Sequence, residues 1–481
     1  MNDLTGRFEE LKNVHLMGIG GAGMSGLALL LRQFGMNISG CDVSHTHYIH
    51  KIATQGIKFS LGHDKNHLDV YKPEAVIYSS AIPSDTEELL EARRKGILTF
   101  KRAEVLSWLF NMRKGIGIAG THGKTTTASM TGLILENAGL DPTVAIGGEL
   151  CDIGGNAKLG SGAHMVAELD ESDGSFELFR SHVAVVTNAD WDHVDFYPNF
   201  NSVLKAYKRF LENRAEEGTA IICGEDKGLS ILLQNNIQGK YLTYGWGNGW
   251  DWGARDVRHT PGGGVSYTVC RKGSPVCDIV LQVSGEHNVL NSLAACAAAD
   301  SAGIPLELSA QALRSFRGAK RRLQHMGFIN RMNVDIYDDY GHHPREVSAT
   351  LSTLKKMFPD RRLTAVFQPH RFTRTAAMYR EFAEVLSLAD GLFLLPVFPA
   401  DEIPIEGVSS TLIGDLVMQK GHGEYALCND MDEVVNRICS SVKEGDVITT
   451  IGAGDVSIVS EKIMQRLERK GVTLDAVAVK A

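Results

Sequence analysis

Short apolar runs of strand length alternate along the chain with longer segments of helical hydrophobic spacing. Such alternation is typical of α/β proteins, in which helices connect the parallel strands of a sheet. The pattern therefore predicts an α/β fold with parallel sheets. The runs that predict strands most clearly are Val14–Met17, Gly115–Ala119, Met165–Ala167, Val183–Thr187, Val334–Tyr337 and Leu363–Phe367.

The pattern starts afresh at three places, which predicts three domains. Two of these places are strands that run into glycine-rich turns, near residues 14 and 115, and the third follows the basic run 320–322. The length of 481 residues agrees, because a domain averages roughly 150 residues and a single core rarely grows beyond about 300. We expect domains at 1–112, 113–319 and 320–481, with an irregular excursion at Gly245–Gly264 in the second.

Composition narrows the class of protein. The net charge of −8 argues against a protein that binds nucleic acid through its phosphate backbone. No apolar run approaches the roughly 18 residues of a membrane span, and the charged first residues carry no signal-peptide pattern, so no membrane partner is expected. The eight cysteines are scattered without a CxxC pair. We therefore expect few disulfides, no structural zinc and a cytoplasmic location.

The first glycine-rich turn has the pattern G-x-G-x-x-G directly after a strand. Its glycines would let the backbone approach a diphosphate, and the helix that follows would supply N–H donors. Asp42 lies 19 residues beyond the last glycine, about where an acid binds a ribose. The loop predicts a diphosphate ligand, with a purely structural turn as the alternative. Its residues are Gly18, Gly20, Gly21, Ala22 and Gly23.

The second glycine-rich turn, 117–127, contains Gly-Lys-Thr between a strand and a helix. A standard phosphate loop of this type would have glycine at position 118, where this chain has Ile118. The working parts remain: backbone N–H groups for phosphates, Lys124 for the β- and γ-phosphate oxygens, and the Thr125 hydroxyl for Mg²⁺. We expect ATP and Mg²⁺ here. The alternative is a buried turn with a surface lysine.

Acidic side chains and a histidine follow two further predicted strands. Glu168 ends the strand 165–167 and is followed by Asp170, Glu171 and Asp173, while His193 follows the strand 183–187. Mg²⁺ prefers oxygen ligands, so a carboxylate at a strand end beside a phosphate loop is a candidate ligand. His193 could ligate a second Mg²⁺ or orient a water molecule. Each acid taken singly could instead be a solvated loop charge.

Two phosphate-binding loops in one chain suggest an enzyme with two nucleotide-type substrates. A nicotinamide-dependent dehydrogenase commonly contains a loop of the first kind but would not need the second loop. A simple kinase would not need the first loop. The dehydrogenase and a non-catalytic nucleotide-binding regulator are kept as alternatives from other classes.

Eight motifs in order resemble the Mur ligase family: GIGGAGMSGLA, GTHGKTTT, AELDESDGSF, TNADWDHVD, GEHNVLNSLAA, KRRLQ, DDYGHHPREV and QPHRFTRT. The resemblance implies a Rossmann-like UDP-binding domain, a central P-loop ATPase-type domain and a C-terminal Rossmann-like domain. It implies ATP-dependent formation of an amide between the carboxylate of UDP-N-acetylmuramate and L-alanine, in peptidoglycan precursor synthesis. We expect a monomer or homodimer. The alternative within the family is a recycling ligase that adds a tripeptide to UDP-N-acetylmuramate.

The resemblance also implies roles for individual residues. It assigns UDP-sugar binding to the first glycine loop and Asp42, metal binding to Thr125, Glu168 and His193, and catalysis to Lys124, His193 and His343. Several relatives carry a carbamoylated lysine, and either Lys205 or Lys208 could be proposed here, although no motif fixes the choice. It assigns ATP binding to Gly120, Thr121, His122, Gly123, Lys124, Thr125, Thr126, His287, Asn288, Asn291 and Arg322.

The resemblance places His370, Arg371 and Arg374 where the C-terminal domain meets its substrates. An arginine guanidinium binds a carboxylate in a two-pronged geometry, so Arg371 and Arg374 could hold the amino acid or contact the muramoyl substrate. The alternative is a solvated pair of arginines. The acids and histidines of 338–343 include candidates for the base that deprotonates the incoming amine, and the sequence does not select one.

Overall fold

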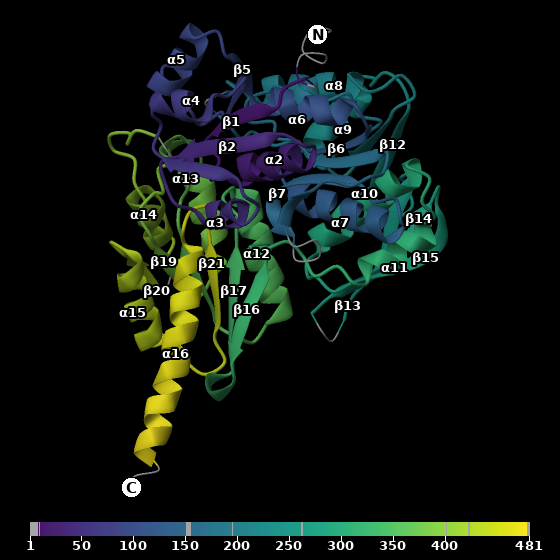
Figure 1. The fold of residues 1–481 in the computed structure, drawn as a ribbon. Coiled ribbons are helices and arrows are strands. Elements are labelled where there is room, and N and C mark those ends of the chain that lie inside the picture. The colour runs from purple at the N-terminus through teal and green to yellow at the C-terminus, as the bar shows by residue number, and fades with distance from the viewer. Residues whose placement is uncertain are drawn as a thin grey trace.

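The computed structural model describes residues 8, 10–150, 155–194, 196–260, 263–400, 402–421 and 424–478. Within this part of the chain the strands form three sheets, built from consecutive stretches of sequence and flanked by helices. Figure 1 shows the N-terminal sheet in purple, the central sheet in blue and teal, and the C-terminal sheet in green and yellow. The predicted three-domain α/β fold is confirmed.

The N-terminal sheet has the strand order β3-β2-β1-β4-β5, with all neighbours parallel. The chain leaves β1 in one direction and returns on its other side with β4, which creates the switch point where such sheets bind ligands. The strands are β1 (Asn13–Met17), β2 (Asn37–Asp42), β3 (Lys58–Leu61), β4 (Ala75–Tyr78) and β5 (Leu98–Lys101). The helices are α2 (Ala22–Gln33), α3 (His47–Ala53), α4 (Asn66–Tyr71), α5 (Glu87–Arg94) and α6 (Arg102–Asn111).

The central sheet has the order β15-β14-β13-β12-β11-β10-β6-β9-β7-β8. It is parallel from β13 to β7 and antiparallel at both margins. Its strands are β6 (Lys114–Ala119), β7 (Thr143–Leu150), β8 (Gly155–Lys158), β9 (His164–Glu168), β10 (Val183–Val186), β11 (Thr219–Cys223), β12 (Tyr241–Trp246), β13 (Trp252–His259), β14 (Val265–Arg271) and β15 (Ser274–Leu281). Its helices are α7 (Lys124–Asn137), the 3₁₀ turn η1 (Ser175–Leu178), α8 (Phe200–Glu212), α9 (Lys227–Gln234), α10 (Glu286–Ser301) and α11 (Leu306–Leu313).

The C-terminal sheet has the order β16-β17-β21-β18-β19-β20, and β16 alone among these described strands runs antiparallel. The strands are β16 (Gln324–Ile329), β17 (Val334–Asp339), β18 (Leu363–Phe367), β19 (Gly391–Leu394), β20 (Glu424–Leu427) and β21 (Val447–Ile451). The helices are η2 (Asn330–Met332), α12 (Pro344–Met357), α13 (Phe372–Leu386), α14 (Thr411–Gln419), α15 (Met431–Ser441) and α16 (Ser457–Ala478), whose far end extends away from the sheet (Figure 1).

The irregular excursion expected at Gly245–Gly264 is wrong for the residues that the structure describes there. Strands β12 and β13 pair with each other, and β13 continues into the antiparallel β14 and β15. Trp252 and Tyr267 are buried, and Gly247 takes a left-handed backbone at the turn between β12 and β13. The aromatic residues therefore serve as core of a sheet extension, which the absence of strict alternation concealed.

The position of strand β6 in the central sheet determines where the second glycine loop lies. Strand β6 occupies the middle of the sheet, between β10 and β9, and α10 packs against α7. The small side chains of α10 make this close packing possible, and most of that helix is buried. The carboxyl ends of β6, β9 and β10 therefore converge, and they bring the loops after all three strands to one place.

Candidate active site

The second glycine loop connects β6 to α7 and depends on two glycines. Gly120 (φ +125°) and Gly123 (φ +80°) adopt backbone conformations that other residues rarely take. A Cβ at Gly120 would lie 2.2 Å from Thr187 Oγ1, and one at Gly123 would lie 2.5 Å from Asn291 Oδ1. The loop therefore closes tightly onto its neighbours and aims the N-terminus of α7 at the space where an anion would bind.

Lys124 is the first residue of α7, and its ammonium is held inside the loop. Its Nζ donates to the carbonyls of Gly120 (2.6 Å) and Thr121 (3.2 Å), and to both carboxylate oxygens of Glu171 (2.9 and 3.0 Å). Burial alone would lower the pKa of Lys124, but Glu171 outweighs it and raises the pKa. The lysine is therefore a fixed positive charge. Glu171 is a site residue that the sequence did not single out beyond its acidic run.

The candidate magnesium ligands lie beside this lysine. Thr125 Oγ1 donates to Glu168 Oε1 (2.9 Å), and the second oxygen of Glu168 accepts from the backbone N–H of Gly147 (2.7 Å). His193, in a left-handed conformation (φ +50°), places Nε2 3.9 Å from a Glu171 oxygen. A hydroxyl and two carboxylates at the mouth of a phosphate loop are the donors that Mg²⁺ prefers. The donor set therefore fits the expected ion.

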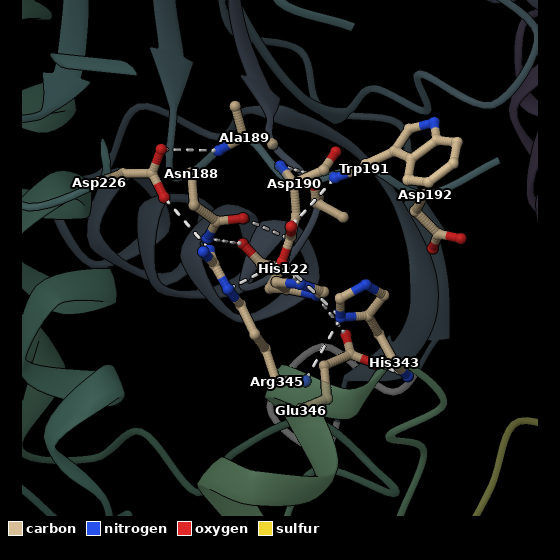
Figure 2. Close-up of polar contacts among 12 residues, drawn as sticks. His122, Asn188, Ala189, Asp190, Trp191, Asp192, Asp226, His343, Arg345 and Glu346 are labelled. Atoms are coloured by element: carbon tan, nitrogen blue, oxygen red, sulfur yellow. Dashed lines mark hydrogen bonds and ion pairs between the residues drawn. The ribbon is translucent and has the colours of Figure 1, made fainter. Parts of the chain in front are cut away.

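His122 joins the loop to the C-terminal domain. Its Nδ1 lies 3.1 Å from Glu346 Oε1 on α12, and its Nε2 lies 3.6 Å from Asp190 Oδ2 (Figure 2). Burial alone would lower the pKa of His122, but the carboxylates of Glu346 and Asp190 outweigh it and raise the pKa to about 9. His122 is therefore protonated at neutral pH and supplies a second positive charge next to the phosphate loop.

Two arginines of the C-terminal domain bind carboxylates of the central domain. Arg345 forms an ion pair with Asp190 (Nε to Oδ2, 2.8 Å) and donates through Nη1 to Asp226 Oδ2 (3.4 Å), as Figure 2 shows. Arg374 binds Asp192 through Nε (3.0 Å) and through Nη2 to both carboxylate oxygens (2.9 and 3.0 Å). Both side chains of the second pair are 6% exposed. These ion pairs hold the two domains together around the loop.

A cavity of about 240 Å³ opens between α10, α12 and the phosphate loop. The hydrogen bonds Asn291 to Asn288 (3.2 Å) and Asn288 to Ser284 O (2.7 Å) fix its amides, and burial lowers the pKa of His287 to about 4. Seven of the predicted ATP-binding residues line this cavity. Phe316, Asp339, Arg345 and Glu346 also line it, and the sequence analysis did not assign them to ATP. The seven are His122, Gly123, Thr126, His287, Asn288, Asn291 and Arg322.

The first glycine loop is fixed by its predicted ribose acid. Asp42 is buried, and its Oδ2 accepts the backbone N–H of Gly20 (2.8 Å). In this structure the carboxylate therefore shapes the loop, and a ribose would have to share it. The guanidinium of Arg102, at the start of α6, lies against Gly23, where an added Cβ would be 2.9 Å from Nη1. Sequence reasoning missed Arg102, because no motif links it to the loop.

The predicted substrate residues of the C-terminal domain do not form a free pair of arginines. Arg374 is occupied by Asp192, and Arg371, held at φ +72° where β18 leads into α13, lies 3.9 Å from Glu402. The His370 ring stacks on Phe398 (5.5 Å between centroids). A substrate carboxylate at Arg374 would therefore have to displace Asp192.

His343 caps α12. Its Nδ1 accepts the backbone N–H of Arg345 (3.3 Å), and Glu346 accepts the backbone N–H of His343 (3.2 Å). Burial lowers the pKa of His343 to about 4, so the ring is neutral.

Of the two lysines considered for carbamoylation, Lys205 is exposed and Lys208 pairs with Glu212 (2.7 Å). Tyr207 is the residue of α8 that reaches the phosphate loop, with its hydroxyl 3.4 Å from Thr121 Oγ1.

The fold and the loop together define a class of nucleotide-binding α/β enzymes, and sequence comparison identifies the family. The catalytic domain of the Mur ligase family matches residues 13–114, the Mur ligase middle domain matches 118–299, and the Mur ligase glutamate ligase domain matches 321–454. The chain belongs to the Mur ligase family, and it is an enzyme of the ligase class.

Particular relatives are similar over nearly their whole length. A UDP-N-acetylmuramate–L-alanine ligase of Lawsonia intracellularis is 39% identical over 95% of this chain and 99% of its own. One from Carboxydothermus hydrogenoformans is 41% identical over 94% and 96%. The crystal structure of a UDP-N-acetylmuramate–alanine ligase from Thermotoga maritima superposes with a TM-score of 0.81 at 29% identity, covering 96% of this chain and all of its own. A murein peptide ligase from Psychrobacter arcticus, 24% identical over 94% and 98% with a TM-score of 0.72, shares the fold.

The structure also bears on two expectations from composition. No helix among the described residues combines the length and apolar character needed to cross a bilayer. The cysteines that the structure describes form no disulfide with one another, and Cys151 lies outside the described residues.

Proposed function

We propose that this enzyme joins L-alanine to the carboxylate of UDP-N-acetylmuramate, with ATP converted to ADP and phosphate, in the cytoplasmic synthesis of peptidoglycan precursors. The observation that carries the proposal is the place of the phosphate loop. His122, Gly123 and Thr126 of this loop line a cavity that residues of the C-terminal domain also line. Lys124 and Thr125 belong to the same loop, and Thr125 contacts Glu168. Nearly full-length relatives that carry the name UDP-N-acetylmuramate–L-alanine ligase support the choice of substrates.

The first half of the reaction activates the acid. A carboxylate oxygen attacks the γ-phosphorus of ATP, the bond to the β,γ-bridging oxygen breaks, and ADP leaves an acyl phosphate behind. Carboxylate and phosphate repel each other by about 4 kcal/mol per pair of unit charges at 4 Å and an effective dielectric near 20. The buried ammonium of Lys124 and the protonated His122 offset this repulsion. Mg²⁺, held by Thr125 and Glu168, would neutralise further phosphate charge.

The second half forms the amide. A base first takes a proton from the ammonium of L-alanine, and the neutral amine then attacks the acyl carbon. Phosphate leaves with the electron pair of the carbon–oxygen bond, and the nitrogen loses a second proton as the amide forms. We propose that the C-terminal face of His370, Arg371 and Arg374 receives the amino acid. Because an acyl phosphate hydrolyses readily in water, the ion pairs that close the C-terminal domain over the loop would protect it.

The substrates are tested by phosphate release from ATP, Mg²⁺ and UDP-N-acetylmuramate with different amines. We expect release with L-alanine at least about tenfold faster than with L-serine or glycine, since one methyl or hydroxyl group in a small pocket discriminates by about 1–3 kcal/mol. The tripeptide L-alanyl-γ-D-glutamyl-diaminopimelate is expected to give background release.

Faster turnover of the tripeptide would replace the proposal with the recycling ligase. Phosphate release as fast without added amine as with L-alanine, or amide formation with NAD in place of ATP, would contradict the ligase mechanism itself. The oligomeric state, for which we keep monomer or homodimer, is not needed for any step above.

A further inference from the structure

A second polar cluster lies in the N-terminal domain, away from the phosphate loop, between the sheet and the helices α4 and α5. Its members are His15 on β1, Cys41 on β2, His67 on α4 and Glu88 on α5, and one ligand atom from each lies within 4.8 Å of the others. His15, Cys41 and Glu88 are fully buried, and the His67 side chain is 12% exposed. Four chemically reactive side chains therefore share one small space.

The cluster lies against an apolar core, although Ser39 (2.9 Å from His15 Nδ1) and the Tyr71 ring also contact His15. Met17, Leu68, Val76, Leu89 and Ala92 form the hydrophobic core between the same sheet face and the same helices. A carboxylate buried among such residues is costly unless positive charge compensates it. The ion-pair partners of Glu88 are the imidazoles of His15 (3.1 Å) and His67 (3.2 Å), which are cations only when protonated. The carboxylate therefore needs a positive charge, which either a protonated imidazole or a bound metal ion would supply.

The spacing of the ligand atoms suits a metal ion. Zn–N bonds of about 2.0–2.1 Å and Zn–S bonds of about 2.3 Å place tetrahedral ligand atoms roughly 3.3–3.7 Å apart. Here Glu88 Oε1 lies 3.1 Å from His15 Nε2 and 3.2 Å from His67 Nδ1, and Glu88 Oε2 lies 3.3 Å from Cys41 Sγ. His15 Nε2 is buried without a hydrogen bond among the described residues, despite its contact with Glu88. This nitrogen points into the cluster as a ligand would.

We propose that His15, Cys41, His67 and Glu88 bind one divalent transition-metal ion, with Zn²⁺ preferred. Thiolate and imidazole together select zinc over the hard cation Mg²⁺, which prefers oxygen ligands. The Nδ1 atom of His63 lies 3.1 Å from Cys41 Sγ, so His63 could orient the sulfur ligand by a hydrogen bond without binding the ion itself. Cysteine binds zinc as the thiolate, so the ion would displace the thiol proton of Cys41 as it binds.

The metal would stabilise the part of the domain that carries the first glycine loop. His15 lies three residues before Gly18, and Cys41 precedes Asp42, the residue that fixes Gly20. One ion would therefore tie β1 and β2 to α4 and α5 behind the loop. The sequence analysis expected no structural zinc because the cysteines are scattered without a CxxC pair. The four ligands proposed here come from four separate elements, so no motif spacing indicates them.

Cobalt absorption tests the site directly. The full-length protein, freed of metal and of any affinity tag, is titrated with Co²⁺, which gives a near-ultraviolet charge-transfer band only when a thiolate is bound to it. We expect the band to saturate at one Co²⁺ per chain, to vanish when Zn²⁺ is added, and to be absent from Cys41→Ser. Co²⁺ at the phosphate loop would give no such band, because the described candidate ligands there offer oxygen and nitrogen.

Cys428→Ser is the matched control, since Cys428 is also buried but lies in the C-terminal domain. It should keep the band, and Zn²⁺ should raise the unfolding temperature of this variant and of the wild type. If Cys41→Ser does not fold, the wild-type titration still decides. Absence of the band from the wild type, or its persistence in a folded Cys41→Ser, would overturn the proposal. The proposed ligase activity does not depend on either outcome.

Discussion

Lys124→Ala is expected to reduce kcat for phosphate release by about 10³-fold or more, with the fold intact. The ammonium of Lys124 is a buried positive charge held inside the phosphate loop by the carbonyls of Gly120 and Thr121 and by Glu171. Losing one such preorganised charge typically costs 10²- to 10³-fold, and roughly 10³- to 10⁵-fold in phosphoryl transfer. Alanine also leaves Glu171 buried without its partner, and this carboxylate can take up a proton rather than unfold the loop.

The measurement combines steady-state kinetics with circular dichroism and thermal unfolding of the same preparation. Lys158→Ala is the matched control, because Lys158 also forms ion pairs within the central domain, with Glu136 (2.6 Å) and Asp141 (2.9 Å), but far along the sheet on β8. The control should retain near-normal kcat. A Lys124→Ala enzyme with near-normal turnover would remove the phosphate loop from the reaction.

Arg374→Ala should separate the C-terminal domain from the central domain. Removing one partner of a buried ion pair typically costs about 3–5 kcal/mol, because the other charge is left buried and unpaired. Here the orphaned Asp192 can regain water if the domain interface opens. We therefore expect kcat/KM to fall by at least about 100-fold, since each tenfold change corresponds to about 1.4 kcal/mol, and amide exchange to rise on both sides of the interface.

Two variants on α13 make this prediction specific. Arg374→Lys keeps the charge but loses the two-pronged geometry, so its defect should be intermediate. Arg380→Ala removes an exposed arginine of the same helix and should have little effect. Unchanged exchange at the interface in Arg374→Ala would show that the pair does not hold the domains together.

Acidification should weaken the same contact. Burial alone would raise the pKa of Asp192, but Arg374 outweighs it and holds the pKa well below the usual aspartate range. The contribution of the pair to stability is therefore fully present above the ordinary aspartate pKa of about 4, and is lost as the pH falls through the lowered value. At neutral pH the interface is at full strength.

What could be predicted from the sequence followed from local signals. Lys124, Thr125 and Glu168 stand at the ends of strands or the start of a helix, and parallel strands bring such ends to one edge of a sheet. The same logic gave the three-domain α/β fold. The roles assigned to individual site residues remain predictions, although the structure brings most of the ATP-binding set to one cavity.

What could not be predicted depends on contacts between distant parts of the chain. Asp192 and Arg374 are 182 residues apart, and nothing in either motif shows that one neutralises the other. The segment Gly245–Gly264 was misread because buried aromatic residues interrupt the alternation expected of strands. Arg102 belongs to the last helix of the N-terminal domain, about 80 residues after the first glycine loop in the sequence, so no local pattern connects the two.

Transfer of oxygen from the sugar acid to phosphate tests the central claim, that ATP activates the carboxylate of UDP-N-acetylmuramate. The substrate is labelled with ¹⁸O in its carboxylate and turned over with ATP, Mg²⁺ and L-alanine, and the released phosphate is analysed by mass spectrometry. An acyl phosphate predicts one ¹⁸O atom in each phosphate and one retained in the amide carbonyl. Phosphate without label would show that ATP is hydrolysed without activating the acid, and would contradict the account.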